Sequence, residues 1–212
     1  MNLYEKYRPD CFEGVIGQDR AVKALKQVKG YGGRAFWLSG MSGTGKTTLA
    51  RIVAHSIADD FFVQEYDSAD EVTAQEINDI ERTMHLYGGG EKCGRAFVIN
   101  EAHGLRANIV RKLLGLLERI PSHVVWLFTT TKEGQLSFFE DHSDASPLLS
   151  RCIEIRLSNQ GLAKLFAKHC QTIAKAEGLD GKPEQAYYRM AQACNNNCRM
   201  MLQQIEAGEM MI

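Results

Sequence analysis

The chain lacks the features that would place it in a membrane or in the secretory pathway. No apolar run among its 212 residues is long enough to cross a bilayer. The first eight residues are polar from the start (MNLYEKYR), so no secretory signal is visible. We therefore expect a cytoplasmic protein with no membrane partner.

An excess of charge of either sign is also lacking. The chain has 25 lysines and arginines against 26 aspartates and glutamates, which gives a formal net charge of −1. This balance excludes a strongly basic nucleic-acid binder, but it is compatible with a local basic patch. Neither internal repeats nor low-complexity tracts are present. The length suits one large domain, or one domain with a small appendage.

The chain also lacks clustered metal ligands. The six cysteines are scattered along the chain, and only Cys194 and Cys198 could share a helix face. No histidine or further cysteine stands at ligand spacing from them, so a zinc site is not expected. Scattered cysteines in a long, core-rich sequence indicate the reduced thiols of a cytosol-like compartment.

The most informative segment that is present covers residues 40–47 (GMSGTGKT) and fits the pattern G-x-x-x-x-G-K-[ST]. A short apolar run at 35–39 indicates a buried strand before it, and apolar residues at helical spacing follow over 48–57. Strand, glycine turn and helix are the context that a phosphate-binding loop requires. The alternative, an ordinary glycine-rich turn with a surface lysine, does not account for that context.

A loop of this kind binds phosphates through its backbone. Its glycines let successive N–H groups point inward, and the following helix adds the positive end of its dipole. Lys46 would reach the β- and γ-phosphates, and the Thr47 hydroxyl would hold Mg²⁺. We therefore predict that the chain binds ATP with Mg²⁺. The nucleotide-binding residues expected from this segment are Gly40, Ser42, Gly43, Thr44, Gly45, Lys46, Thr47 and Thr48.

Further apolar runs predict the rest of the fold. Strands are expected at 61–67, 96–99 and 124–128, with an edge strand at 153–157. Continuous apolar strands that alternate with helices indicate a parallel sheet covered on both faces. The fold class is thus α/β, a P-loop NTPase with a five-stranded parallel sheet and flanking helices. A helix is expected at about 21–28, before the first strand, and further helices between strands at about 73–87 and 107–119.

The chain ends in helices alone. They are expected at about 160–177, 184–194 and 197–208, with a break at 178–183. We predict a nucleotide-binding α/β domain over 1–157 and a small helical lid domain over 158–212. In such sheets the ligand lies beyond the carboxyl ends of the strands, where the glycine loop, residues 100–101 and residues 129–131 would meet.

Together these motifs resemble the AAA+ ATPases, and most closely the clamp-loader subunits, namely the bacterial gamma/tau subunit and the small subunits of replication factor C. The N-terminal residues 7–18 resemble the family's YRP…F…V.GQ segment, which packs beside the adenine in relatives. The alternative is a capping segment before an amphipathic helix. The resemblance implies that the base contacts Tyr7, Arg8, Pro9, Val15 and Ile16.

Residues 99–103 (INEAH) stand where the family has its Walker B sequence. Glu101 matches the residue that activates the attacking water, whereas Asn100 replaces the usual aspartate. An asparagine offers Mg²⁺ only a neutral oxygen, so we expect the ion to be bound weakly or through a water. Two interpretations follow: some ATP hydrolysis, which we favour, or ATP binding with poor turnover.

The resemblance also implies residues that respond to the γ-phosphate. Arg151 lies in the Ser-Arg-Cys motif of clamp loaders, where the arginine enters a neighbouring subunit's site, which implies an oligomer. Either Thr130 or Thr131 matches the sensor-1 position, and alignment by eye does not choose between them. Arg199 follows two asparagines at the sensor-2 position. Alternatively, Arg151 and Arg199 are solvated surface residues.

Relatives of this kind act on DNA and a sliding clamp. Their helix after Walker B grips the duplex backbone, and the matching candidates here are Arg106, Arg111 and Lys112, unless these are merely solvating charges. An insertion at 132–147 is acidic, which argues against nucleic-acid contact, and its aromatics are candidates for docking on a neighbour. Relatives usually continue into a collar domain after the lid, so we expect a fragment or shortened relative, or assembly through the ATPase domains alone.

The favoured function is an ATP-hydrolysing, clamp-loader-like subunit that works in DNA replication or repair within an oligomer of AAA+ subunits. The alternative is a hydrolysis-impaired scaffold subunit that donates Arg151 to an active neighbour. A small-molecule kinase is less favoured, because the sequence suggests no separate acceptor pocket.

Overall fold

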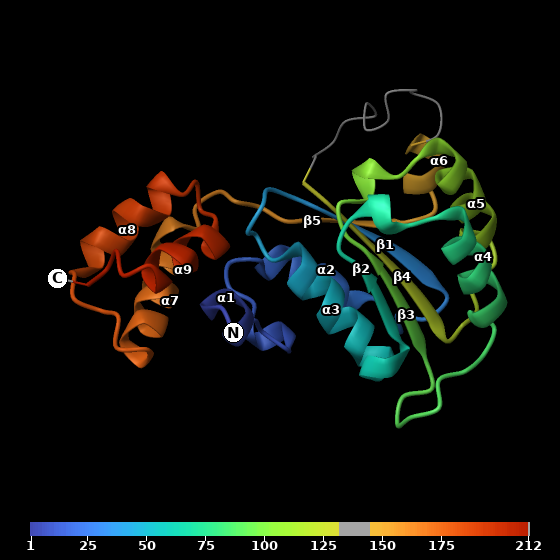
Figure 1. Ribbon diagram of the computed structural model, residues 1–212, viewed down its shortest axis with the longest axis horizontal. Helices are drawn as coiled ribbons and strands as arrows, with labels where there is room; N and C mark the ends of the chain where they lie inside the picture. The colour runs from blue at the N-terminus through green and yellow to red at the C-terminus, as the bar shows by residue number, and fades with distance from the viewer. Residues whose placement is uncertain (132–144, 212) are drawn as a thin grey trace.

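A five-stranded parallel sheet forms the centre of the computed structural model, which describes residues 1–131 and 145–211 (Figure 1). The strand order is β2-β3-β4-β1-β5, and every neighbouring pair is parallel. The predicted α/β class with a five-stranded parallel sheet is confirmed. The strands are β1 (Arg34–Ser39), β2 (Val63–Tyr66), β3 (Arg95–Ile99), β4 (Val124–Thr130) and β5 (Ile153–Arg156).

Both faces of the sheet are covered by helices. Alternate side chains of β1 point to opposite faces: Phe36 and Leu38 pack in one apolar core, and Trp37 packs in the other. The helices α2 (Asp19–Gln27) and α3 (Lys46–Ile57) cover the first face, while α4 (Ala74–Thr83), α5 (Ala107–Leu117) and α6 (Ala145–Leu149) cover the second. This two-sided burial explains why the strands are continuous apolar runs in the sequence.

The second strand begins later than the sequence predicts. Phe61 and Phe62 lie in a 3-10 turn, Asp60–Phe62, ahead of β2, and the Phe61 side chain is 91% exposed. Periodicity cannot detect this boundary, because an apolar pair looks the same in a turn as in a strand. The helix predicted to reach Tyr87 ends at Thr83, and the Tyr87 ring stacks on His123 at 4.0 Å.

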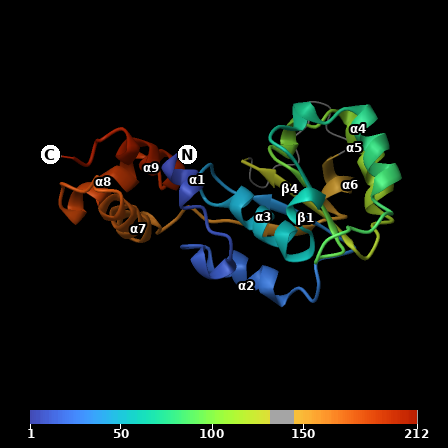
Figure 2. The same cartoon turned by 60° about the horizontal axis from the view of Figure 1, so that its bottom comes forward.

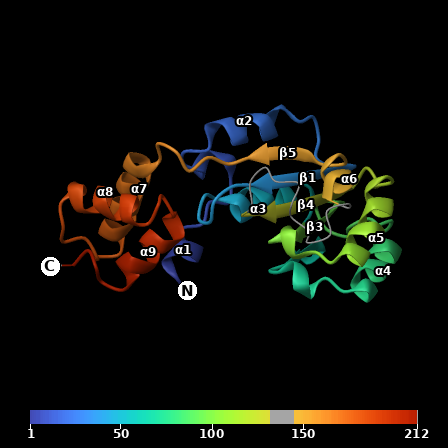
Figure 3. The ribbon, with the colours of Figure 1, turned by 90° about the horizontal axis from the view of Figure 1, so that it is seen from above.

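Three helices, α7 (Ala163–Ala176), α8 (Glu184–Ala193) and α9 (Cys198–Glu206), form a separate body beyond one end of the sheet (Figure 2). Their apolar core includes Phe166, Tyr187 and Leu202. Leu3 of the short helix α1 (Leu3–Lys6) packs into the same core, so the N-terminus lies between the sheet and α7–α9 (Figure 3). We keep the division at 157/158 as a proposal.

Within the described residues, none of the helices is long and apolar enough to span a membrane. Of the predicted insertion at 132–147, residues 132–144 lie outside the described residues.

Candidate nucleotide-binding site

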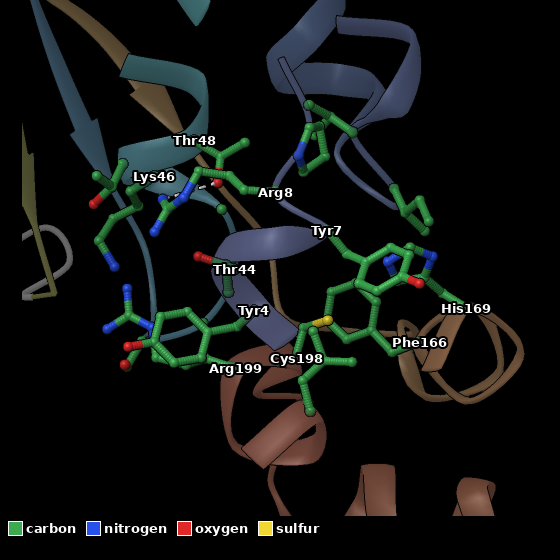
Figure 4. Close-up of a pocket in the computed structure, with 18 of the residues that line it drawn as sticks. Tyr4, Tyr7, Arg8, Thr44, Lys46, Thr48, Phe166, His169, Cys198 and Arg199 are labelled. Atoms are coloured by element: carbon green, nitrogen blue, oxygen red, sulfur yellow. Dashed lines mark hydrogen bonds between the residues drawn. The ribbon is translucent and has the colours of Figure 1, made fainter. Parts of the chain in front are cut away.

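A pocket opens where the loop after β1 meets the N-terminal segment and the helices α7 and α9 (Figure 4). All of the predicted nucleotide-binding residues except Gly40 line it, together with Glu101 and Arg199. Sequence reasoning missed several further lining residues, which come mainly from α1, α7 and α9. They are Tyr4, Gly14, Phe166, His169, Cys198 and Leu202.

The glycine loop has the backbone geometry that its sequence predicts. Gly43 and Gly45 have φ angles of +75° and +101°, in the left-handed region that favours glycine. A Cβ at Gly43 would lie 1.9 Å from Asn197 Oδ1, at the start of α9. Within the described parts of the chain, nothing beyond the adjoining backbone approaches within 4 Å of a Cβ built at Gly45, so this side of the loop is open to a ligand. The loop therefore combines a packed side with an open one.

Lys46 lies inside the curve of this loop. It is the first residue of α3 and is only 6% exposed. Its Nζ donates hydrogen bonds to the carbonyl oxygens of Gly40 at 2.8 Å and Met41 at 3.0 Å. A phosphate bound by the loop would therefore meet a fixed ammonium group beside the helix N-terminus.

Thr47 and Asn100 lie together at the carboxyl edge of the sheet. Thr47 Oγ1 donates to Asn100 Oδ1 at 3.0 Å, although the two residues are 53 positions apart. Hydroxyl and amide oxygens are hard ligands, and Mg²⁺ completes its shell with waters and phosphate oxygens. These two residues therefore fit a magnesium ion that is bound jointly with a nucleotide. Their assignment as its ligands stays a proposal.

Three consecutive threonines at the end of β4 each contact a different residue of the 100–103 segment. Thr129 Oγ1 donates to Asn100 Oδ1 at 3.0 Å, and Thr131 Oγ1 donates to Glu101 Oε2 at 3.1 Å. Thr130 Oγ1 lies 3.2 Å from His103 Nδ1. Both candidate sensor residues thus adjoin the segment that carries Glu101, and Thr131 contacts Glu101 itself. The sequence predicts Thr129 at this edge of the sheet and His103 in the Walker B segment, but it assigns neither residue a role of its own.

Glu101 adopts a strained backbone conformation. Its φ of +49° is in the left-handed region, which is uncommon for a residue with a side chain. The carboxylate is held by Thr131 and lies 3.3 Å from His103 Nδ1. This conformation places Glu101 in the wall of the pocket.

Two arginines add positive charge near the glycine loop. Arg8 Nη1 lies 3.5 Å from Thr48 Oγ1, and the same guanidinium pairs with Glu5, which lowers the pKa of that carboxyl. The Arg199 guanidinium lies over the Tyr4 ring, 5.4 Å from its centroid. Together with Lys46, the two arginines give the pocket a distribution of positive charge that suits a triphosphate.

The opposite side of the pocket is more apolar. Tyr7, Phe166 and His169 lie close together there (Figure 4). Burial lowers the pKa of His169, which favours the neutral imidazole. An apolar wall with a neutral ring suits a nucleobase better than a phosphate. No sequence motif marks Phe166 or His169, because both are ordinary positions of a lid helix.

Arg151 lies outside this pocket. Its Nη1 donates to the carbonyl oxygen of Pro147 at 2.8 Å, and its Nη2 pairs with Glu118 just after α5. Arg106 and Arg111 are exposed on or beside α5, whereas Lys112 Nζ donates to Asn78 Oδ1 of α4 at 2.7 Å. The structure thus does not bring Arg151 or these basic residues to the chain's own pocket.

Comparison with solved structures supports the fold. A single-substitution variant of RuvB from Thermotoga maritima superimposes with a TM-score of 0.71 at 19% identity, over 94% of this chain and 64% of that one. A gamma-subunit-related protein of DNA polymerase III from the same organism gives a TM-score of 0.54 at 11% identity, over 82% and 58% of the two chains. At these identities the likeness concerns the fold alone.

Sequence relatives are more specific. The chain is 28% identical over 202 residues to the DNA polymerase III gamma subunit of Buchnera aphidicola (Acyrthosiphon pisum), covering 84% of this chain and 53% of that one. It is also 28% identical over 204 residues to the replication factor C large subunit of Methanocella arvoryzae, covering 91% and 34%. The chain thus spans about half the length of the gamma subunit.

The family model of the ATPases associated with various cellular activities (AAA) matches residues 36–152. This range runs from β1 to just before β5 and contains the glycine loop, Asn100, Glu101 and Arg151. The chain therefore belongs to the AAA family of ATPases and is similar to clamp-loader subunits.

Proposed function

We propose that this chain binds ATP with Mg²⁺ and hydrolyses it as one subunit of a clamp-loader-like oligomer that acts on DNA in replication or repair. The observation that supports hydrolysis is the arrangement of Glu101, in the pocket wall and hydrogen-bonded to Thr131. The similarity to the gamma and replication factor C subunits supports the role in replication, with other AAA+ subunits, DNA and a sliding clamp as partners.

In this proposal each polar group has a separate task. The loop N–H groups and Lys46 hold the phosphates, Thr47 and Asn100 hold the ion, and Glu101 accepts a proton from the attacking water. Bound Mg²⁺ would neutralise charge on the phosphate oxygens. The apolar wall around Phe166 would exclude water from the base, and Arg199 would contact the phosphates from α9.

Replacing Glu101 with glutamine tests the hydrolytic part. We expect turnover to fall at least about 100-fold, because the amide cannot accept the proton of the water. ATP affinity should stay within about threefold, because the amide keeps the size of the carboxyl group. Steady-state ATPase assays and calorimetric titration with ATP measure the two quantities.

The exposed Glu184 of α8 supplies the control, as Glu184→Gln removes the same charge outside the pocket. Equal turnover of the Glu101→Gln variant and the wild type would contradict the proposed role.

Asn100 supports a second candidate function, a nucleotide-binding scaffold that hydrolyses ATP poorly. Its neutral oxygen already accepts hydrogen bonds from Thr47 and Thr129. Tight ATP binding by the wild-type protein, with no turnover at any protein concentration and with or without primed DNA, would favour the scaffold. Turnover that rises with protein concentration and DNA would favour the hydrolysing subunit.

DNA binding should depend on Arg106 and Arg111. We expect the Arg106→Ala/Arg111→Ala variant to bind duplex DNA more weakly. The logarithm of its binding constant should also fall less steeply with the logarithm of the salt concentration, as expected for the loss of about two phosphate contacts. Lys112→Ala is measured separately, because Lys112 Nζ donates to Asn78 Oδ1 of α4. Fluorescence anisotropy over a range of salt concentrations measures both quantities.

The matched control is Arg20→Ala/Lys23→Ala, which removes two exposed charges from α2 on the other face of the sheet. An equal loss of DNA affinity in this control would contradict the assignment of DNA binding to Arg106 and Arg111.

A further inference from the structure

The side-chain amide of Asn100 has every hydrogen-bonding position filled. Its Oδ1 accepts from Thr47 and Thr129, each at 3.0 Å. Its Nδ2 donates to Glu65 Oε1 at 2.8 Å and to the carbonyl oxygen of Tyr66 at 3.2 Å. An amide offers two donors and two acceptor positions, and all four are paired in this structure, which holds no nucleotide. Asn100 is only 6% exposed, so water cannot replace these partners, and the buried amide depends on these four hydrogen bonds.

The partners on β2 decide which way this amide faces. A carboxylate and a backbone carbonyl can only accept hydrogen bonds, so the nitrogen of Asn100 must point toward Glu65. Threonine hydroxyls can donate or accept, and they therefore exert no such preference. With the nitrogen held by Glu65, the oxygen of Asn100 is directed at Thr47, where the ion is expected.

Glu65 is itself held in place. Its Oε2 accepts a hydrogen bond from Arg51 Nε of α3 at 2.7 Å, and its side chain is 17% exposed. Arg51 also lies 3.6 Å from Glu5 Oε2, so one cation faces two carboxylates. A carboxylate that accepts from an amide N–H polarises that amide and makes its oxygen more negative. The Glu65 charge thus reaches the oxygen that faces Thr47.

We propose that Glu65 is a positioning residue of the cation site, which aims the oxygen of Asn100 at Thr47, beside the expected ion, and supplies the negative charge that an aspartate would otherwise carry there. This inference rests on the proposed function, the binding of ATP with Mg²⁺. It also explains why asparagine is suited to position 100 in this chain.

Asparagine and aspartate at position 100 would differ in their need for the charge of Glu65. An aspartate at position 100 has no N–H to donate, so its carboxylate would face that of Glu65 at hydrogen-bond distance. With aspartate present, the charge of Glu65 is therefore superfluous. With asparagine present, it is required.

A double-mutant cycle tests this dependence. The four proteins are the wild type, Glu65→Gln, Asn100→Asp and the Glu65→Gln/Asn100→Asp variant. The measured quantity is the ratio of the dissociation constants of a β,γ-imido ATP analogue in EDTA and in Mg²⁺, by calorimetry. Glu81→Gln is the control, because Glu81 of α4 also pairs with an arginine, at 2.8 Å from Nη2 of Arg119, which follows α5.

We expect Glu65→Gln to lower this ratio about tenfold in the wild-type background, with the affinity in EDTA unchanged. In the Asn100→Asp background the same change should leave the ratio unaltered or raise it, because the introduced glutamine amide can donate to the aspartate. Glu81→Gln should change nothing in either background. An equal effect of Glu65→Gln in both backgrounds, or none in the first, would overturn the proposal.

The Tm of the same four proteins, measured without nucleotide or Mg²⁺, separates this inference from the proposed function. Glu65→Gln should lower the Tm in the wild-type background and raise it in the Asn100→Asp background. If the wild-type protein binds no nucleotide, the proposed function fails, and this Tm pattern alone decides whether Glu65 aligns Asn100. Tm changes of the same sign in the two backgrounds would overturn the inference.

Discussion

Lys46→Ala should lower the affinity for ATP on the order of 100-fold, in the presence or absence of Mg²⁺. The lysine Nζ is buried within the glycine loop, 2.8 Å from the Gly40 carbonyl oxygen. Charge-assisted hydrogen bonds contribute about 1.5–3 kcal/mol each, and two of them to phosphate oxygens account for the expected loss. Calorimetric titration with ATP measures it.

Lys23→Ala is the matched control, because this exposed lysine of α2 lies outside the pocket. The unfolding temperature of Lys46→Ala must be recorded as well, since Gly40 and Met41 lose a donor to their carbonyl oxygens. A folded Lys46→Ala protein with wild-type affinity for ATP would show that the loop does not hold the phosphates.

Arg151→Ala should lower ATP turnover by about 10³–10⁵-fold while ATP affinity stays unchanged. The guanidinium pairs with Glu118 and contacts Pro147, and it does not line the chain's own pocket. Such a loss of turnover would therefore require that Arg151 acts in the pocket of a neighbouring subunit. The pairing is partly exposed to solvent, so its loss should cost little stability.

A mixing experiment shows whether Arg151 works between subunits. Arg151→Ala subunits keep Glu101, and Glu101→Gln subunits keep Arg151, so an interface between the two contains one complete site. We expect the mixture to be more active than either variant alone. Activity of the mixture equal to the average of its components would exclude a site shared in this way.

The elements with local signals were predictable from the sequence. β1, β3 and β4 are buried on both faces and so appear as continuous apolar runs, and the glycine loop needs positive φ at Gly43 and Gly45. The start of β2 was not predictable, because the aromatic pair Phe61 and Phe62 has the same polarity in a turn as in a strand.

Residues that enter the site through tertiary packing were also missed. Phe166 and His169 reach the pocket only because α7 packs beside the N-terminal segment. Asn100 stood out as a departure from the family, but its partner Glu65 is 35 positions away in the chain. The pairing of β2 with β3 brings them together, and no local pattern encodes that adjacency.

Gly43 packs closely against Asn197, so the phosphate loop directly contacts the start of α9. Asn197 also caps α9 by accepting from the Met200 backbone N–H at 3.2 Å, so the same side chain contacts the loop and the helix end. Coupling between two sites is reciprocal in free energy. A partner that bound α9 and altered this contact would change ATP affinity by the same factor by which ATP changes the affinity for that partner.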